Sequence, residues 1–463
     1  MDPKDNSKIS QQIQTLIKKG SRASFISLLQ AHHEADIADS VSELSLDEQK
    51  AFFLKLNPEL GAHILEEYSL NQQIELISEL KTTLAAKYIE EMEPDDAVDL
   101  IEELQETNQE KADHILKALP QKEADELKTL LAYPENSAGA IMTSHFISIP
   151  ENLSVKSAIN RIRKANPPDS EISFFIYVVN KKTQLKGVTS LRNIVMANAT
   201  DTIQNIRNNT PIKTHVETDQ EDVAKLFQKY DLISLPVVND NEELVGIITV
   251  DDIVDVVVEE ASEDLLKLSG TAETNENTLL SGNLFHNVLS RLPWLSLTIS
   301  GGIIASYLIT YFSKLYQSPH IPLALCLSFI PMLMGLGGNV GNQSATIIVR
   351  GLSLGLIKQK RPLYHVLRET FTGLLMGSII GTIVAGFTYI YISQNITFCL
   401  IIGLSLIGNM TTATIIGAGL PILLSQLKID PAVASAPVIS STLDILTQLI
   451  YFALTLLIFQ QLL

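Results

Sequence analysis

Two long runs without a charged residue constrain the fold of this chain more than any other feature. The first covers 35 residues, 315–349, and the second covers 58 residues, 370–427. A helix crosses the hydrocarbon core of a bilayer in about 20 residues. The longer run is therefore expected to hold two spans, separated by the polar residues 393–395. Runs of this length favour membrane spans over the buried helices of a soluble protein.

The pattern predicts five membrane-spanning helices, which places the two termini on opposite sides. Their expected limits are 292–312, 321–341, 371–392, 396–424 and 432–462. Basic residues gather in the connection between the second and third spans: Arg350, Lys358, Lys360, Arg361 and Arg368. Because cytoplasmic loops are enriched in Lys and Arg, the N-terminus is expected in the cytoplasm and the C-terminus outside.

Charge divides the chain into two parts. The protein has a formal net charge of −18, of which −23 lies before His286 and +5 lies from His286 onward. The acidic part would repel phosphate, which argues against nucleic-acid binding. Both cysteines, Cys326 and Cys399, lie in apolar runs, so a disulfide framework is excluded. The polar N-terminus lacks the pattern of a cleavable signal peptide, and the acidic part is expected in the cytoplasm.

Asp444 is the only acid deep inside a predicted span. A carboxylate at that depth is costly, so it is expected to face a polar cavity or a bound cation. The alternative is a protonated Asp that joins two helices through a hydrogen bond.

The second predicted span contains Pro331 and four glycines within 335–341. These residues disfavour an unbroken helix, so we expect irregular backbone whose carbonyl oxygens line a cavity. Asn339 and Asn342 add amide oxygens. Oxygen ligands suit hard cations such as Mg²⁺, and no thiolate or imidazole pattern favours copper or zinc. The alternative role of the glycines is close packing between helices, and both roles are compatible.

Residues 137–260 contain an internal repeat with an offset of 59 residues. The Val-Val-Asn of 178–180 recurs at 237–239. Each copy has the pattern of a helix, a Val-rich strand, a polar turn, a second strand and a helix. This order resembles a pair of cystathionine-β-synthase (CBS) domains, with expected limits of 137–200 and 201–257.

The CBS resemblance implies a nucleotide site in the second copy. Thr249 and Asp252 match the Thr and Asp that hold a ribose in that family, so ATP is a candidate ligand. The first copy has Ser190 and Asn193 instead and lacks the acid. The alternative is that the pattern is only the folding signature of the module.

Residues 1–136 are predicted to form an acidic helical superhelix, because apolar residues recur at three- and four-residue steps and prolines separate short units. Acids concentrate in 90–99, although most acidic surfaces of this kind are solvated. A second acidic segment, 251–264, follows the repeat. As a helix it places like charges on one face, where they repel unless cations lie between them; a solvated connecting helix is the alternative.

Three motifs resemble the MgtE family of magnesium channels and transporters. The strongest lies within 331–350 and contains the run GGNVGNQSAT. The second combines the Asp-Pro-Ala of 430–432 with Asp444, and the third covers 133–143 ahead of the CBS pair. The domain order also matches the family over essentially the whole chain, with a connecting plug helix expected at 258–285.

The resemblance implies a homodimer in the bacterial inner membrane, with a Mg²⁺ pore between protomers lined by the second and fifth spans. It assigns the pore to Gly338, Asn339, Asn342 and Asp444. One departure is Ala436, where some members of the family have Asn, which puts an ion contact at that point in doubt.

The resemblance also implies negative feedback, in which cytoplasmic Mg²⁺ between the helical domain, the CBS pair and the plug helix holds the channel closed. Without the ion, like charges would repel and the domains would separate. The sensor residues implied in this way are Asp95, Asp99, Asp251, Asp252, Asp255, Glu259, Glu260, Glu263 and Asp430.

The predicted fold class is multidomain, with α and α+β soluble domains and an α-helical membrane domain at 286–463. The predicted function is uptake of Mg²⁺ by a channel or coupled transporter. An enzyme is not expected, because no nucleophile–base arrangement or phosphate loop is visible. Two alternatives stay open: a membrane-anchored CBS sensor of ions or nucleotides that transports nothing, and a transporter of other divalent cations such as Co²⁺ or Mn²⁺.

Overall fold

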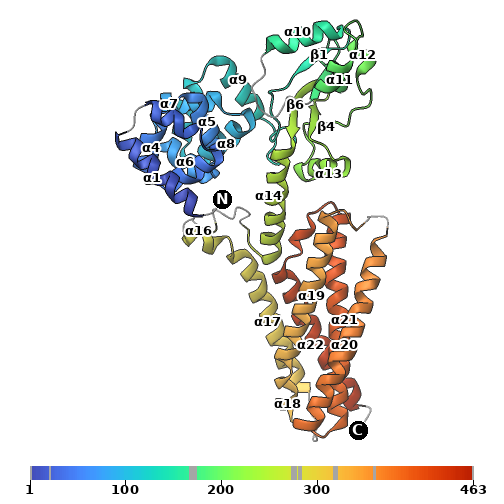
Figure 1. Ribbon diagram of the computed structural model, residues 1–463. Helices are drawn as coiled ribbons and strands as arrows, with labels where there is room; N and C mark the ends of the chain where they lie inside the picture. Colours follow the sequence, from blue (N-terminus) through green and yellow to red (C-terminus); the bar gives the residue numbers. More distant parts are fainter. Residues whose placement is uncertain are drawn as a thin grey trace. The chain divides into compact units, whose positions relative to one another are not determined.

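The computed structural model describes residues 3–19, 22–165, 175–272, 279, 284–315, 322–357 and 361–460. The chain divides into two units, Met1–Val258 and Glu259–Leu463. Figure 1 colours both units along the chain from blue to red.

The first unit begins with short helices that pack around a shared apolar core (Figure 1). They are α1 (Pro3–Lys19), α2 (Arg22–Leu29), α3 (Glu34–Ser42), α4 (Leu46–Phe53), α5 (Pro58–Glu66), α6 (Leu70–Glu79), α7 (Thr82–Glu91), α8 (Pro94–Ala118) and α9 (Gln121–Leu130). Ser45 and Ser69 start α4 and α6 with capping boxes. Pro58 and Pro94 occupy the first turns of α5 and α8, where no backbone N–H is needed. The predicted acidic helical domain is confirmed.

The rest of the first unit contains two small sheets that repeat each other. The first copy consists of β1 (Ser148–Pro150), α10 (Val155–Ala165), β2 (Phe175–Val179), β3 (Leu185–Ser190), α11 (Leu191–Met196) and α12 (Ile203–Ile206). The second consists of β4 (Thr214–His215), α13 (Gln220–Tyr230), β5 (Ser234–Val238), β6 (Leu244–Thr249) and α14 (Val250–Ser269). In each sheet the first strand pairs parallel with the second, and the second pairs antiparallel with the third. The predicted tandem CBS fold is confirmed.

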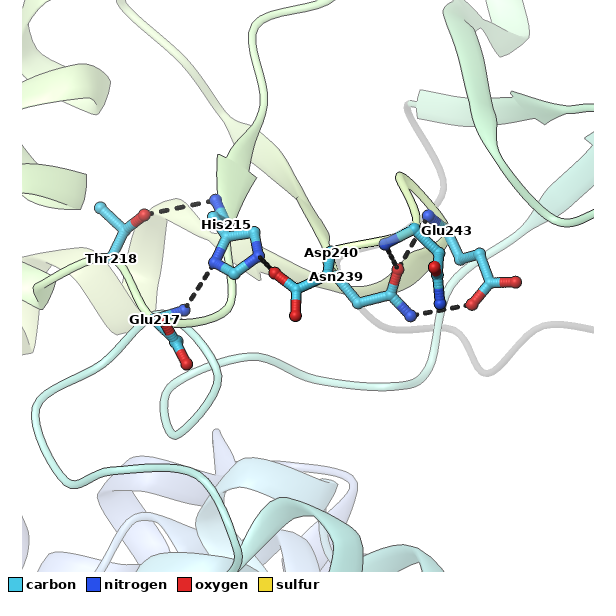
Figure 2. Close-up of polar contacts among 7 residues, drawn as sticks. His215, Glu217, Thr218, Asn239, Asp240 and Glu243 are labelled. Carbon is cyan, nitrogen blue, oxygen red and sulfur yellow. Dashed lines mark hydrogen bonds and ion pairs between the residues drawn. The ribbon is translucent and has the colours of Figure 1, made fainter.

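The polar turns of the two copies have the same conformation. Thr183 and Glu242 occupy equivalent positions and have left-handed φ angles of 57° and 64°. Asn180 and Asn239 each donate a side-chain hydrogen bond of 2.9 Å to the residue four positions later. Figure 2 shows the second of these turns beside His215. The two copies therefore match each other even in individual side-chain hydrogen bonds.

The second unit consists of the end of α14 and a bundle of long apolar helices (Figure 1). Its further elements are α16 (Leu284–Leu289), α17 (Leu292–Leu315), α18 (Leu323–Ser328), α19 (Ile330–Ser353), α20 (Pro362–Tyr391), α21 (Ile396–Gln426), the 3₁₀ turn η2 (Pro431–Val433) and α22 (Ala436–Gln460). α21 packs against α19, α20 and α22, and α17 packs on α22.

Five stretches of the described residues are long and apolar enough to cross a bilayer. They are Leu284–Leu315, Leu323–Ser353, Pro362–Tyr391, Ile396–Gln426 and Ala436–Ile458. The five predicted spans are confirmed, although their limits differ. The last span begins at Ala436 rather than at residue 432, because η2 turns the chain just before it.

The helix predicted to connect the CBS pair to the membrane domain at 258–285 has other limits. α14 begins directly after β6 at Val250 and ends at Ser269. Gly270 follows with a φ of 82°, a left-handed conformation that suits a residue without a side chain after a helix. Residues 273–278 and 280–283 of the predicted segment lie outside the described residues.

The irregular backbone predicted for the glycine-rich segment is wrong. α19 is continuous from Ile330 to Ser353, and the interruption lies before it, between α18 and α19. In a bilayer the backbone polar groups need partners within the helix, and this requirement outweighs the low helix propensity of glycine. Pro331 lies in the first turn of α19, where its missing N–H is tolerated.

Glycines of α19 instead allow neighbouring helices to approach closely. A Cβ atom at Gly337 would lie 2.7 Å from Oδ1 of Asn409 on α21. The backbone of Gly341 leaves no room for a Cβ atom at Gly417, also on α21. Close packing between helices is therefore the role that these positions have.

The same packing predicts a specific sensitivity of α20 to substitution. A Cβ atom at Gly377 would lie 2.8 Å from Cα of Ile407, whereas one at Gly386 of the same helix meets nothing within 4 Å. We expect Gly377→Ala to lower the melting temperature of the detergent-solubilised protein by about 2–4 °C, because it pushes α20 away from α21. Gly386→Ala is the control and should not lower it. Equal melting temperatures for the two variants would contradict the close contact.

Candidate functional site

A polar cavity of about 480 Å³ lies in the membrane unit, between α19 and α22. Its lining residues are Pro331, Met334, Gly335, Gly338, Asn339, Asn342, Ser440 and Asp444. The four residues predicted to form a pore, Gly338, Asn339, Asn342 and Asp444, all belong to this set. The structure thus brings them together on two helices that are about a hundred residues apart in the chain.

The unbroken α19 determines which of its residues face the cavity. Six of them recur at spacings of one, three or four residues, as one face of a helix requires. The carbonyl oxygens of this segment are engaged within the helix, so the predicted exposure of carbonyls to an ion is not met. The glycines contribute space instead, since a Cβ atom at Gly338 would lie 3.7 Å from Ser440 Oγ.

Side-chain oxygens supply the polar groups of the cavity. Asn342 Nδ2 donates a hydrogen bond to Ser440 Oγ at 3.3 Å. The carboxamide oxygen of Asn342 is buried and has no hydrogen-bond partner among the described residues, a condition that costs about 1–3 kcal/mol if nothing else binds there. No charged group in the described part of the chain acts on Asp444. This arrangement favours a cation ligand over an interhelical hydrogen bond of Asp444.

The cavity is open along one side in the single chain. Pro331, Gly335 and Asn339 are exposed, whereas Val340 and Gly341 on the other side of α19 are buried. The face of α19 that carries Asn339 is therefore directed outward from the bundle.

Asn409 on α21 joins α19 and α22 behind the cavity. Its Nδ2 donates to the carbonyl oxygen of Leu333 at 2.6 Å, and its Oδ1 accepts from Thr447 Oγ1 at 2.5 Å. A further hydrogen bond of 2.9 Å runs from Ser344 Oγ to Glu369 Oε2 on α20. These residues were not among the predicted ones, although a lone Asn in the middle of an apolar span indicates a hydrogen bond between helices.

A cluster of carboxylates lies in the first unit, where α5, the start of α8 and the start of α14 meet. We call it the acidic cluster, and its members are Glu66, Glu93, Asp95, Asp96, Asp99, Asp251 and Asp252, which act on one another electrostatically. Asp95, Asp99, Asp251 and Asp252 were predicted as sensor residues. Glu66, Glu93 and Asp96 were missed, because only the fold brings Glu66 on α5 to the start of α8.

Burial and mutual repulsion raise the pKa values of the acidic cluster. Burial is the main cause for Glu93, whose pKa rises to about 7 with help from Glu66 and Asp252. Burial also raises the pKa of Asp96 to about 8, with Glu66 and Asp99 adding repulsion. Asp95 is 9% exposed, and its pKa is raised well above the usual value by burial and by Asp252.

The acidic cluster has the chemistry of a divalent-cation site but not a preformed coordination shell. Oδ1 of Asp95 is buried and has no hydrogen-bond partner among the described residues. Carboxylate oxygens are the ligands that Mg²⁺ prefers. Within the described ranges, however, no group of three or more His, Cys, Asp or Glu side chains already has a geometry that could hold a metal ion. Binding of Mg²⁺ here would therefore need side-chain rearrangement or bridging water.

The other predicted sensor residues lie along α14 and before α22. Asp255, Glu259 and Glu260 lie further along α14, and Asp255 acts electrostatically on Asp251 and Asp252 of the acidic cluster. Glu263, also on α14, and Asp430, before η2, both form ion pairs with Lys267. A protein cation thus already contacts two of the predicted Mg²⁺ ligands.

The predicted nucleotide residues contact each other. Thr249 Oγ1 and the Thr249 backbone N–H both donate to Asp252 Oδ2, at 2.5 and 3.2 Å. The first copy forms a related cap, in which Ser190 Oγ accepts from the backbone N–H of Asn193 at 3.1 Å. This contact explains how α14 begins, and binding of a ribose stays a prediction.

Five helices that are long and apolar enough to span a bilayer, a cavity lined by Asn, Ser and Asp side chains between two of them and a CBS pair define the class: a multi-pass membrane protein related to cation transporters. Residues 330–454 match a family described as divalent cation transporter (MgtE). Residues 32–136 match the MgtE intracellular N domain, and residues 138–199 and 203–259 match the CBS domain. The chain belongs to the MgtE family.

Two similar proteins come from other bacteria. The magnesium transporter MgtE of Bacillus subtilis is 34% identical over 339 residues, which is 73% of each chain. The magnesium transporter MgtE of Thermus thermophilus is 33% identical over 335 residues, 72% of this chain and 73% of that protein.

Two crystal structures resemble part of this chain. One is of the soluble part of a magnesium transporter; it has a TM-score of 0.52 and 31% identity, and covers 55% of this chain and 99% of its own. The other is of the cytosolic domain of the Mg²⁺ channel MgtE in complex with ATP; it has a TM-score of 0.50 and 30% identity, and covers 53% of this chain and 99% of its own.

The raised pKa values of the acidic cluster predict a dependence of stability on pH. The folded state binds more protons than the unfolded state between about pH 4 and pH 8, so the free energy of unfolding falls as pH rises through this window. We expect the full-length protein in detergent, without Mg²⁺, to melt several degrees lower at pH 8 than at pH 6. Millimolar Mg²⁺ should reduce the difference, because it binds the ionised form.

The variants that test this prediction and their control all lie on α8 or at its N-cap, Glu93. Glu93→Gln combined with Asp96→Asn should flatten the pH profile of the melting temperature. Asp113→Asn, an exposed position on α8, should leave the profile unchanged. A wild-type profile that is flat from pH 6 to pH 8 would show that the acidic cluster does not hold protons in this range.

Proposed function

We propose that this protein transports Mg²⁺ across the bacterial inner membrane and that the cavity between α19 and α22 is part of the ion path. The observation that carries the proposal is the pair of uncompensated oxygen ligands in that cavity, Asp444 and the buried carboxamide oxygen of Asn342. The relatives that are named magnesium transporters support the choice of ion.

The size of the cavity suits an ion that keeps its water. Mg²⁺ loses water reluctantly and is usually bound through one or two carboxylates together with several waters. At about 30 Å³ per water, a volume of about 480 Å³ accommodates a hydrated ion. Asp444 would supply the negative charge, and Asn342 and Asn339 would bind the water molecules that coordinate the ion.

We further propose that two copies of the chain form the complete pore. A cavity open on one side exposes Pro331, Gly335 and Asn339, and a second copy facing it would enclose the ion between two Asp444 carboxylates. In the proposed orientation the N-terminus lies in the cytoplasm and the C-terminus outside, because the basic connection between α19 and α20 favours the cytoplasmic side.

Feedback by cytoplasmic Mg²⁺ is the proposed role of the acidic cluster. Its members repel one another when ionised, so Mg²⁺ that binds there stabilises the closed arrangement of the helical domain (1–136), the CBS pair and the connecting helix. Asp255, Glu259, Glu260, Glu263 and Asp430 are proposed to extend this response toward the membrane. ATP is a proposed ligand of Thr249 and Asp252, which the relative crystallised with ATP supports.

Asp444 provides the direct test of the transport proposal. We expect Asp444→Ala to reduce Mg²⁺ flux into proteoliposomes by at least 100-fold, because its carboxylate is the only charged group among the described residues that line the cavity. Thr442→Ala, an exposed position on the same helix, should retain normal flux. Flux should be compared for Mg²⁺, Co²⁺ and Mn²⁺, since the family is described as transporting divalent cations. Normal flux by Asp444→Ala would exclude this cavity as the path.

Asp95, whose buried Oδ1 has no hydrogen-bond partner among the described residues, provides the test of the feedback proposal. We expect Asp95→Asn to raise the Mg²⁺ concentration that half-inhibits flux by about tenfold, because one carboxylate of the acidic cluster is lost while the shape is kept. Asp113→Asn is the control on the same helix. The measurement is flux at varied Mg²⁺ on the cytoplasmic side. If both variants closed at the wild-type concentration, the acidic cluster would not be the sensor.

A further inference from the structure

A second polar contact joins the two helices that line the cavity. At one end of the cavity Asn342 on α19 donates to Ser440 on α22. About two turns away on each helix, Gln448 Nε2 on α22 donates to Met334 Sδ on α19 at 3.4 Å. The two helices therefore run antiparallel along the cavity, and Asp444 lies between the two contacts.

A stripe of polar side chains on α22 continues past Asp444. Ser440, Asp444 and Gln448 follow one another at every fourth position, so they share one face of the helix. Ser440 and Asp444 line the cavity, as does Met334. Because Gln448 contacts Met334, it lies one side chain away from the cavity.

The carboxamide of Gln448 is buried and only half satisfied. The residue is 1% exposed, and its Oε1 has no hydrogen-bond partner among the described residues. A thioether sulfur accepts hydrogen bonds, and only weakly, so the nitrogen of Gln448 faces Met334 and the oxygen is left over. An unpaired carboxamide oxygen in apolar surroundings is costly. It therefore favours a partner that comes from outside the chain.

Two other buried polar side chains of α22 have partners within the chain. Thr447 Oγ1 donates to Asn409 Oδ1 at 2.5 Å, and Thr455 Oγ1 donates to the carbonyl oxygen of Tyr451 at 2.7 Å. Both threonines are at most 2% exposed. Hydrogen bonds of this kind join or stabilise membrane helices. Gln448 differs from them in its free acceptor, which packing between helices does not explain.

We propose that Gln448 is a further binding residue for the transported ion, and that its carboxamide oxygen accepts a hydrogen bond from water held by a hydrated divalent cation. The proposal rests on the transport function proposed above and extends the ion path by about one turn of α22. Met334 covers this oxygen and opens the way to it by a change of rotamer, because its unbranched side chain is adaptable. Mg²⁺ keeps several of its waters when it binds, so an oxygen that binds water suits it.

Gln448→Leu tests this role, because leucine fills the space without an oxygen. We expect the Mg²⁺ concentration that gives half-maximal flux into proteoliposomes to rise about tenfold, since one hydrogen bond to the hydrated ion is lost. The maximal flux should change by less than about twofold, because the loss concerns binding. The melting temperature in detergent without Mg²⁺ should not fall, because an apolar side chain replaces an unpaired buried amide.

Thr455→Val is the matched control on the same helix. It also removes a buried polar group, but one whose hydrogen bond stays within α22. This variant should keep the half-saturating Mg²⁺ concentration of the wild type. A wild-type value for Gln448→Leu would overturn the proposal. If that variant also melted several degrees lower and had a reduced maximal flux, the role of Gln448 would be purely structural.

A cryo-electron microscopy structure of the full-length protein in nanodiscs with Mg²⁺ gives a readout that is independent of flux. We expect density for water or an ion within hydrogen-bond distance of Gln448 Oε1, and a protein group at that place would overturn the proposal. Normal flux in the wild type with an unaltered Gln448→Leu would refute this proposal alone. A wild type without Mg²⁺ flux would refute the transport proposal, and the density would still show whether the oxygen binds water.

Discussion

A carboxylate that is removed from water needs either a proton, a protein cation or a bound ion, and this requirement shapes each part of the protein. Burial disfavours the charged form of an acid, and neighbouring acids add to the effect. The chain nevertheless places acids in three partly or fully buried settings: Asp444 in the membrane, the acidic cluster of the first unit, and Glu263 with Asp430 at the end of α14. The three settings differ in what neutralises the charge.

The differences indicate different roles. Asp444 has no charged neighbour in the described chain and lines a cavity of oxygen ligands, which suits a mobile ion. Burial and repulsion by neighbouring acids raise the pKa of Asp96 in the acidic cluster to about 8, which favours its protonated form at neutral pH. Glu263 and Asp430 both form ion pairs with Lys267, a cation of the chain itself. The same functional group therefore lies in three different surroundings.

Much of this arrangement could be predicted from the sequence, because it follows from local patterns. Uncharged runs defined the spans, the offset of 59 residues defined the CBS repeat, and an acid at membrane depth indicated the cavity. The predictions that were wrong or incomplete concern the packing of helices against one another. The glycines of α19 have a low helix propensity, but contacts such as that of Gly337 with Asn409 and the absence of water keep the helix unbroken. Glu66 joins the acidic cluster only because α5 packs near α8, and no spacing in the sequence contains that information.

The ion pairs of Lys267 also show that sequence spacing does not reveal contacts between distant charged residues. The position of Lys267 four residues after Glu263 predicts a helical ion pair of small energy. Its contact with Asp430 joins residues 163 positions apart in the chain and depends on where α14 ends. Counting acids along α14 therefore overstates the number that are available to a metal ion.

The two CBS copies share strand order, register and even the left-handed turns at Thr183 and Glu242, yet the helices that follow them differ. α11 has 6 residues, whereas α14 has 20 and continues into the second unit. A gene duplication followed by lengthening of a single helix is enough to account for this asymmetry. In this view a small binding module became part of a membrane protein through the extension of one helix by about four turns.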